Sequence, residues 1–92
     1  MNYYVYILYS STTSRYYKGI TNDLERRLKE HNLGQEKATR SGLPWTLVWY
    51  TFKPTKGQAM VLEKKLKNIG TQKRLQDFML RHPDGGPDDQ QS

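Results

Sequence analysis

The amino-acid sequence predicts an α+β domain in which a small three-stranded antiparallel sheet is flanked by about three helices, in the order β-β-α-β-α-α. Three observations predict this fold. Two runs of aromatic and β-branched residues flank a polar cluster near the N-terminus, a third such run lies in the middle of the chain, and three other segments each open with a helix-capping residue. The 92 residues fit one domain with one small core.

The first two strands are expected at about residues 3–9 and 15–20. Six of the seven tyrosines lie within the first seventeen residues, and aromatic and β-branched residues favour strands. The serines and threonines of residues 11–14 separate the two runs, which is typical of a β-hairpin. The sequence does not fix the pairing register, so it leaves open whether Tyr6 and Tyr17 are neighbours.

The next three elements alternate between helix, loop and strand. A helix is expected at about residues 22–32, because Asn22 and Glu25 have the spacing of a capping box. A loop is expected over residues 33–44, which are rich in Gly and polar residues. The third strand is expected at residues 45–52, which carry the strongest strand pattern in the chain.

Two further helices are expected after this strand. Thr55 is suited to cap a helix over about residues 55–69, and Gly70 is suited to its C-terminal cap. Thr71 can then begin a third helix that runs to about residue 80.

The C-terminal residues differ from the rest of the chain in composition. Residues 82–92 are polar and rich in Pro and Gly, and segments of that composition bury too little apolar surface to fold. We therefore expect a domain over residues 1–81 and a disordered polar tail over residues 82–92.

The composition excludes several classes of protein. The chain contains no cysteine, which excludes a disulfide framework and a thiolate metal site. It has no run approaching the ~20 apolar residues that span a bilayer and no signal-peptide pattern at its N-terminus. These features lead us to expect a cytoplasmic protein without a membrane partner.

The charge of the chain points to a polyanionic partner. The formal net charge is +6, and residues 1–81 hold fifteen basic and six acidic residues, a net charge of +9. A compact domain this basic attracts nucleic acid by charge alone. The alternative is that the charge serves only solubility, and composition does not separate the two.

The helix expected at residues 22–32 carries two unusual residues on its apolar face. At about 100° per residue, Leu24, Arg27, Leu28 and His31 share one stripe. An arginine on a buried stripe is unfavourable unless it is paired or lies at the edge of a cleft. Two interpretations stay open: a functional pair, or an Arg27 whose head reaches solvent beside a hydrogen-bonded core His31.

Glu63 lies near the edge of the apolar stripe of the helix expected at residues 55–69. It is the only acidic residue among five lysines: Lys56, Lys64, Lys65, Lys67 and Lys73. A lone carboxylate in a basic surround is suited to bind a hard divalent cation beside phosphates. The alternative is a surface ion pair with Lys67, one helical turn later.

Two features of the expected strands concern packing. Gly19 is expected to allow a tight turn or the close approach of another backbone. Trp45, Leu47 and Trp49 alternate in sequence, so we expect them to share one face of their strand. We interpret the tryptophans as packing in the core or at an edge of the sheet, rather than as a surface on which bases stack.

Four segments together resemble the GIY-YIG nuclease superfamily, which includes phage-type homing endonucleases and the incision module of bacterial excinucleases. The two signature triplets are Tyr4-Val5-Tyr6 and Tyr17-Lys18-Gly19. Residues 21–32 match the motif in which a catalytic arginine precedes a histidine, and residues 59–67 match the helix that bears the metal-binding glutamate. The resemblance covers residues 3–80 and is closest to the small single-domain bacterial members.

The resemblance implies metal-dependent hydrolysis of a phosphodiester with a single divalent ion, Mg²⁺ or Mn²⁺, held by Glu63. Arg27 would donate to the scissile phosphate. Tyr6 is the first choice for the residue that activates water and Tyr17 the second, and nearby cations are expected to lower the phenol pKa. His31 would position the phosphate or share the proton transfer.

The expected substrate is DNA, and RNA is not excluded. Contacts with its backbone are expected from five residues: Lys18, Lys37, Thr39, Arg40 and Lys67. The likeness to the excinuclease module adds DNA repair as an expected process, and the lack of an appended DNA-binding domain in this sequence adds a targeting protein as an expected partner. The alternative is a non-catalytic nucleic-acid-binding module on the same scaffold.

Overall fold

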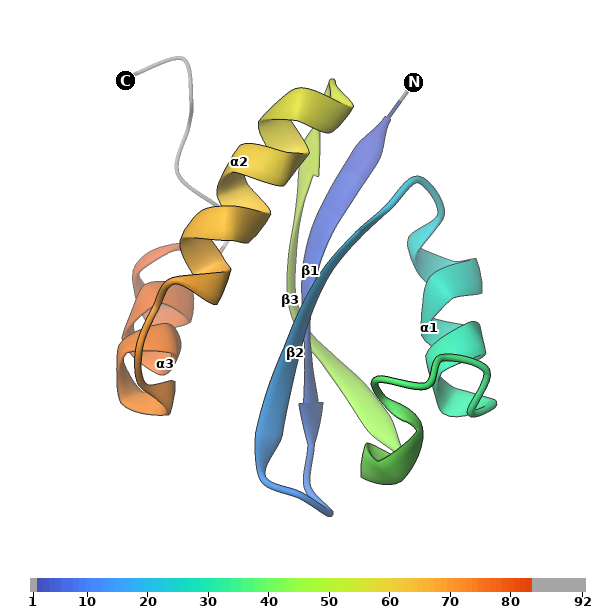
Figure 1. Ribbon diagram of the computed structural model, residues 1–92. Coiled ribbons are helices and arrows are strands. Elements are labelled where there is room, and N and C mark those ends of the chain that lie inside the picture. The colour runs from blue at the N-terminus through green and yellow to red at the C-terminus, as the bar shows by residue number, and fades with distance from the viewer. Residues whose placement is uncertain (1, 84–92) are drawn as a thin grey trace.

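The structure is a computed structural model, and it describes residues 2–83. Three strands, β1 (Tyr3–Ser10), β2 (Arg15–Thr21) and β3 (Trp45–Lys53), form one antiparallel sheet in the order β2-β1-β3 (Figure 1). Among the described residues, β1 is therefore the only strand paired on both sides. The predicted three-stranded antiparallel sheet is confirmed.

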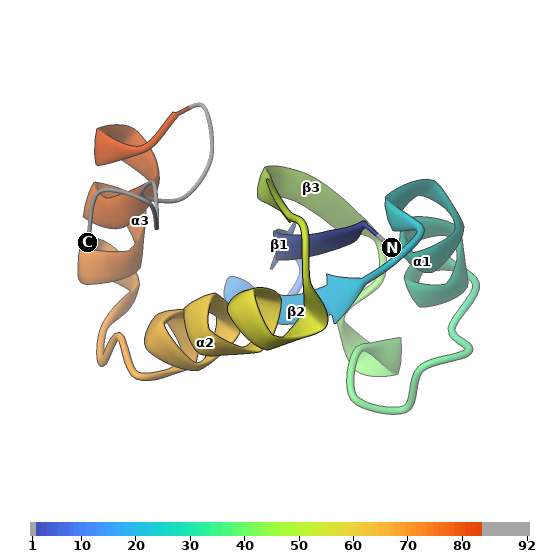
Figure 2. The ribbon, with the colours of Figure 1, turned by 90° about the horizontal axis from the view of Figure 1, so that it is seen from above.

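Three α-helices cover the two faces of this sheet. They are α1 (Leu24–Asn32), α2 (Lys56–Lys67) and α3 (Gln72–Arg81), and a short 3₁₀ helix η1 (Arg40–Gly42) precedes β3. Figures 1 and 2 show α1 on one face of the sheet, with α2 and α3 on the other. The predicted order β-β-α-β-α-α is confirmed.

The central strand β1 contributes to a separate core on each face. Val5 and Ile7 pack with Trp49 against α2 and α3, whereas Tyr6 and Leu8 pack with the α1 side. Residues 5–8 are consequently all buried. Burial on both faces explains why this strand is a continuous run of apolar and aromatic residues rather than an alternating one.

A β-bulge in β3 changes which face its tryptophans occupy. Ile7 pairs with Trp49 and Leu8 pairs with Leu47, which leaves Val48 as the extra residue. An inserted residue reverses the alternation of side chains beyond it, so Trp45 joins the α1 side and Trp49 the α2 side. The prediction that both share one face was wrong, but both are buried core residues, one of the two predicted placements.

The helix caps follow the sequence with two corrections. Thr55 and Thr71 cap α2 and α3 as predicted. Asp23 rather than Asn22 caps α1: its carboxylate accepts from the backbone N–H of Arg26 at 3.0 Å, and its own N–H is held by the Thr21 hydroxyl at 3.1 Å. An ionised carboxylate is the stronger acceptor at a helix N-terminus.

The second correction concerns the end of α2. The helix ends at Lys67, and Asn68 forms the C-cap with a right-handed backbone conformation. Its N–H bonds to carbonyls of the last turn. The cap therefore needs no residue with positive φ, and the predicted role of Gly70 as the cap was wrong.

The described chain ends against the sheet. Trp49 Nε1 donates to the carbonyl oxygen of His82 at 2.8 Å, and the centroids of the His82 and Phe78 rings lie 4.7 Å apart. Of the tail predicted over residues 82–92, residues 84–92 lie outside the described residues. Within residues 2–83, no helix has the length and apolar character that crossing a membrane would require.

Candidate active site

Tyr6 is placed by its pairing with Gly19 across the β1–β2 hairpin. The phenol ring lies over Gly19, where an added Cβ would fall 2.5 Å from the Tyr6 hydroxyl and 2.6 Å from Cζ. The missing side chain at Gly19 therefore makes room for a phenol, not for the turn or neighbouring backbone expected from the sequence. Tyr6 itself is 1% exposed.

His31, at the end of α1, joins Tyr6 to the loop before β3. Its Nε2 lies 2.9 Å from the Tyr6 hydroxyl, and its Nδ1 lies 2.8 Å from the hydroxyl oxygen of Thr39. The centroid of the Tyr17 ring lies 5.0 Å from that of the His31 ring and 6.3 Å from that of the Tyr6 ring. We call Tyr6, Tyr17, His31 and Thr39 the tyrosine–histidine cluster; it shows that the two phenols are neighbours.

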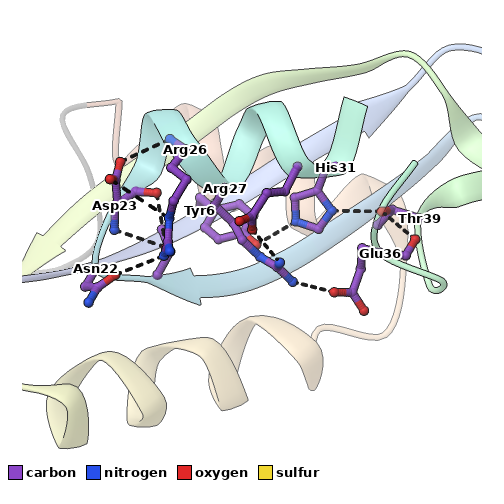
Figure 3. Close-up of polar contacts among 10 residues, drawn as sticks. Tyr6, Asn22, Asp23, Arg26, Arg27, His31, Glu36 and Thr39 are labelled. Atoms are coloured by element: carbon purple, nitrogen blue, oxygen red, sulfur yellow. Dashed lines mark hydrogen bonds and ion pairs between the residues drawn. The ribbon is translucent and has the colours of Figure 1, made fainter. Parts of the chain in front are cut away.

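Arg27 lies at the rim of this cluster, with 26% of its side chain exposed. Its side chain points from α1 towards Glu36 in the loop (Figure 3), with Nη2 2.7 Å from a Glu36 oxygen and Nη1 3.0 Å from Glu30. The guanidinium also interacts with the Tyr6 phenol. Arg27 lies on the apolar stripe of α1, and its charge is paired with two carboxylates at the edge of the cluster. Pairing is one of the two conditions under which an arginine on such a stripe is favourable.

Glu63 lies on α2, which packs against the other face of the sheet. Its carboxylate is 3.4 Å from Lys67 Nζ, and 22% of its side chain is exposed. Lys18 of β2 is close enough to Lys67 for the two charges to interact. Among residues 2–83, no hydrogen bond or ion pair joins Glu63 to the tyrosine–histidine cluster, which lies on the α1 side of β2.

Comparison with known proteins identifies the family. The family model described as the GIY-YIG catalytic domain matches residues 2–76. The chain belongs to the GIY-YIG family. The resemblance of the four sequence segments is thereby confirmed, and membership of this nuclease family supports a nuclease-type function with nucleic acid as the substrate.

Relatives of similar length share this GIY-YIG domain. UPF0213 protein BH0048 of Halalkalibacterium halodurans is 40% identical over 88 residues, which span 95% of this chain and 89% of that protein. A UPF0213 protein of Haloquadratum walsbyi is 39% identical over 75 residues, spanning 80% and 83% of the two chains. The solution NMR structure of BH0048 matches with a TM-score of 0.55 at 39% identity, over 95% of this chain and 89% of that one.

The pKa values in the cluster follow from burial. Loss of solvation raises the pKa of Tyr6 to about 12, and hydrogen bonding from Arg27 opposes this only in part. Burial also lowers the pKa of His31, and the nearby Arg27 charge lowers it further. The expectation that nearby cations bring the Tyr6 pKa below its usual value is wrong, because desolvation of the phenolate outweighs their effect. At neutral pH the cluster holds a neutral phenol beside a neutral imidazole.

The Glu63 carboxylate is a suitable ligand for a divalent cation. The carboxylate is partly exposed and supplies the oxygen ligands that Mg²⁺ and Mn²⁺ prefer. Among residues 2–83 there is no group of three or more His, Cys, Asp or Glu side chains that would enclose a metal. A cation held there would thus take most of its ligands from water and phosphate, as Mg²⁺ commonly does.

The loop before β3 contributes two residues to the site, Thr39 and Glu36, that the sequence did not place there. Thr39, expected to contact nucleic acid, is fully buried against His31, whereas Lys37 and Arg40 are exposed on the surface. Arg40 donates to the carbonyl oxygen of Gly34 at 3.0 Å. Glu36 was missed, because a single acid in a loop without periodicity carries no signal that it will meet Arg27.

Proposed function

We propose that this GIY-YIG domain is a divalent-metal-dependent endonuclease that hydrolyses phosphodiester bonds in DNA through a single ion. One observation supports it most: a buried phenol, Tyr6, is hydrogen-bonded to a neutral imidazole, His31, beside the paired guanidinium of Arg27. A proton acceptor, a proton relay and a phosphate-binding cation are the groups that phosphodiester hydrolysis requires.

Tyr6 activates the attacking water through His31 in this proposal. With a pKa of about 12, the phenol is not ionised at neutral pH. The phenol oxygen therefore takes a proton from water while its own proton passes to His31 Nε2, 2.9 Å away. The water oxygen bonds to phosphorus as the P–O ester bond breaks, and the leaving oxygen takes a proton from solvent. Tyr17, against the His31 ring, is the alternative base.

Arg27 binds the scissile phosphate. Its planar guanidinium is suited to two phosphate oxygens and stabilises the charge that grows on them. One of its nitrogens now holds Glu36 at 2.7 Å, so the phosphate would take the place of that carboxylate. Glu63 would hold the divalent ion, which when bound supplies Lewis-acid stabilisation of the phosphate. Lys18 and Lys67 beside it, with Lys37 and Arg40 on the loop, would contact the nucleic acid backbone.

The test compares two glutamates that form the same kind of ion pair. Wild-type protein with Mg²⁺ or Mn²⁺ is expected to nick supercoiled plasmid DNA, and chelation of the metal is expected to stop it. Glu63→Gln should reduce nicking to background while folding and DNA binding persist. The matched control is Glu25→Gln, because Glu25 pairs with Lys29 at 3.7 Å with the same i,i+4 spacing, on a helix that packs on the other face of the sheet. Metal-dependent nicking by Glu63→Gln at the wild-type rate rejects the assignment.

A second function has one observation in its favour. Arg27 is occupied by two carboxylates, and Glu63 is paired with Lys67 on the other side of β2. That arrangement suits a basic module that binds nucleic acid without cleaving it. A gel shift without nicking, in the presence of either metal, would favour this module over the nuclease.

A further inference from the structure

Thr39 occupies a position that is fixed on every side. Its side chain is fully buried. Its carbonyl oxygen accepts from the indole Nε1 of Trp45 at 2.6 Å and from the N–H of Gly42 at 3.1 Å, and its N–H donates to the Glu36 carbonyl at 3.1 Å. The hydroxyl is therefore held in one place, 2.8 Å from His31 Nδ1.

The hydrogen bonds around His31 can be satisfied in only one order. The Thr39 hydroxyl donates to the carbonyl oxygen of Glu36 at 3.4 Å, which leaves its oxygen to accept from Nδ1–H of His31. Nε2 then has no proton and accepts from the Tyr6 hydroxyl. The two ring nitrogens of a neutral histidine have opposite roles, and the partner of one sets the role of the other.

The opposite order leaves a proton without an acceptor. If Thr39 donated to Nδ1, then Nε2–H would donate to the Tyr6 oxygen. The Tyr6 hydroxyl proton would then have no acceptor among the contacts of the described residues. A buried donor without a partner is unfavourable, so the first order is the stable one.

We infer that Thr39 is a positioning residue that holds His31 as the Nδ1–H tautomer, with Nε2 directed as a base at the Tyr6 hydroxyl. The charged and titratable groups around His31 are Tyr6 on β1, Tyr17 on β2, Arg27 and Glu30 on α1, and Glu36 in the loop. None of them lies at Nδ1, where the neutral hydroxyl of Thr39 is the hydrogen-bond partner. The catalytic consequence rests on the proposed function, but the tautomer itself does not.

The first experiment needs no variant and no activity. Ring nitrogens of His31 in ¹⁵N-histidine-labelled wild-type protein are observed by long-range ¹H–¹⁵N NMR at neutral pH, with His31→Gln used to assign the signals. We expect a protonated Nδ1 and an unprotonated Nε2. An Nε2–H tautomer, or protonation of both nitrogens, would overturn the inference.

The second experiment compares two substitutions that differ by a hydroxyl. Thr39→Val keeps the side-chain shape but has no oxygen to accept from Nδ1–H, whereas Thr39→Ser keeps the oxygen. We expect Thr39→Val to lose the pure Nδ1–H tautomer and to reduce kcat about 10- to 100-fold with KM unchanged, the size of effect found when an orienting partner is removed. Thr39→Ser should restore both the tautomer and most of kcat.

The outcomes separate this inference from the proposed function. A Thr39→Val protein that keeps both the Nδ1–H tautomer and the wild-type kcat would show that Thr39 does not position His31. Wild-type protein that shows the expected tautomer but does not nick DNA with Mg²⁺ or Mn²⁺ would reject the nuclease and leave the tautomer assignment standing. Amide NMR spectra of each variant show whether it is folded, and if Thr39→Val does not fold, the wild-type measurement decides.

Discussion

Ionisable side chains are held differently on the two faces of the sheet. On the α1 face, Tyr6 and His31 are buried and are joined across 25 residues of sequence. On the α2 face, Glu63 is partly exposed and pairs with Lys67, one helical turn away. The first arrangement is imposed by tertiary packing and exists before any substrate arrives. The second is a local pair of the kind that solvent screens and a ligand can replace at little cost.

This difference suggests a division of roles. A proton relay needs fixed geometry, which the buried and hydrogen-bonded tyrosine–histidine cluster provides. A site that exchanges a lysine partner for a cation and phosphates needs an accessible carboxylate, which Glu63 provides. Arg27 is intermediate, because it contacts the buried Tyr6 and also reaches the surface. The predictions that follow test this division.

The largest effect is expected from Arg27, which lies between the buried cluster and the surface. Arg27→Ala removes the proposed donor to the phosphate in the transition state, so we expect a fall of about 10²-fold or more in the nicking rate. Arg26→Ala is the matched control, because Arg26 is the adjacent residue and its exposed side chain contacts its own helix N-terminus, at Asp23 (4.0 Å) and Asn22 Oδ1 (3.3 Å). Initial rates of plasmid nicking measure both. Equal rates for the two variants would mean that Arg27 has no special part in cleavage.

Burial of the Tyr6 phenol on the α1 face leads us to predict how stability depends on pH. The folded-state pKa of Tyr6, about 12, lies above the unfolded value of 10.0. The neutral Tyr6 phenol therefore contributes fully to the free energy of unfolding below pH 10, and this contribution is lost as pH rises through 12. We expect the stability advantage of wild type over Tyr6→Phe to shrink by about 2 kcal/mol across that range, at 1.36 kcal/mol per pKa unit. Urea unfolding of both proteins at several pH values measures it.

Both proteins share the titration of the other tyrosines and the lysines, so the difference between them isolates Tyr6. A stability difference that stays constant from pH 9 to pH 12 would contradict the assignment of Tyr6 as a buried phenol. An absorbance titration of phenolate gives an independent check, since Tyr6→Phe should remove a phenol that ionises near its pKa of about 12.

The same contrast explains what the sequence predicts and what it does not. Strand patterns and capping residues are local, so the order of elements and the caps at Thr55 and Thr71 are predicted correctly. The stripe on α1 correctly directs Arg27 and His31 towards the sheet, because helical periodicity is also local. Glu63 and Lys67 are one turn apart, so their pair is among the predicted alternatives.

Apart from the two helix caps, where the position was wrong by one or two residues, the failures involve contacts between distant segments. The bulge at Val48 depends on how β3 pairs with β1, so its effect on Trp49 is not visible in the alternation of β3 alone. Thr39 and Glu36 lie in a loop without periodicity, and their partners are fixed only when the loop folds over α1. The pKa of Tyr6 depends on the depth of burial, which a list of neighbouring cations does not reveal.

Gly19 tests whether the geometry of the buried cluster matters. In Gly19→Ala the new Cβ would lie 2.5 Å from the Tyr6 hydroxyl, and a ring that is 1% exposed has no free space to move into. We expect a loss of stability of about 1–3 kcal/mol from overpacking, together with reduced nicking, because Tyr6 is displaced from His31. Thermal unfolding and nicking assays measure the two effects.

Gly57→Ala is the control on the other face. Apart from the neighbouring residues and the backbone of its own helix, no described atom lies within 4 Å of a Cβ built at Gly57 in α2, so alanine there is expected to stabilise by about 0.5–1 kcal/mol. If Gly19→Ala matched wild type in both stability and nicking, the close packing of Tyr6 on β2 would have no functional weight.

The smallest effect is expected at Glu36, which holds Arg27 at the position proposed for phosphate. Glu36→Gln removes a negative charge that competes with phosphate for the guanidinium, so we expect DNA to bind about 2- to 5-fold more tightly at low salt, the scale of an exposed ion pair. Glu25→Gln changes the net charge equally but lies beside Lys29 rather than Arg27. A gel-shift titration that gives both variants the same gain would show a general effect of charge. A gain confined to Glu36→Gln, and lost when Arg27→Ala is added, would place the phosphate at Arg27 on the α1 face.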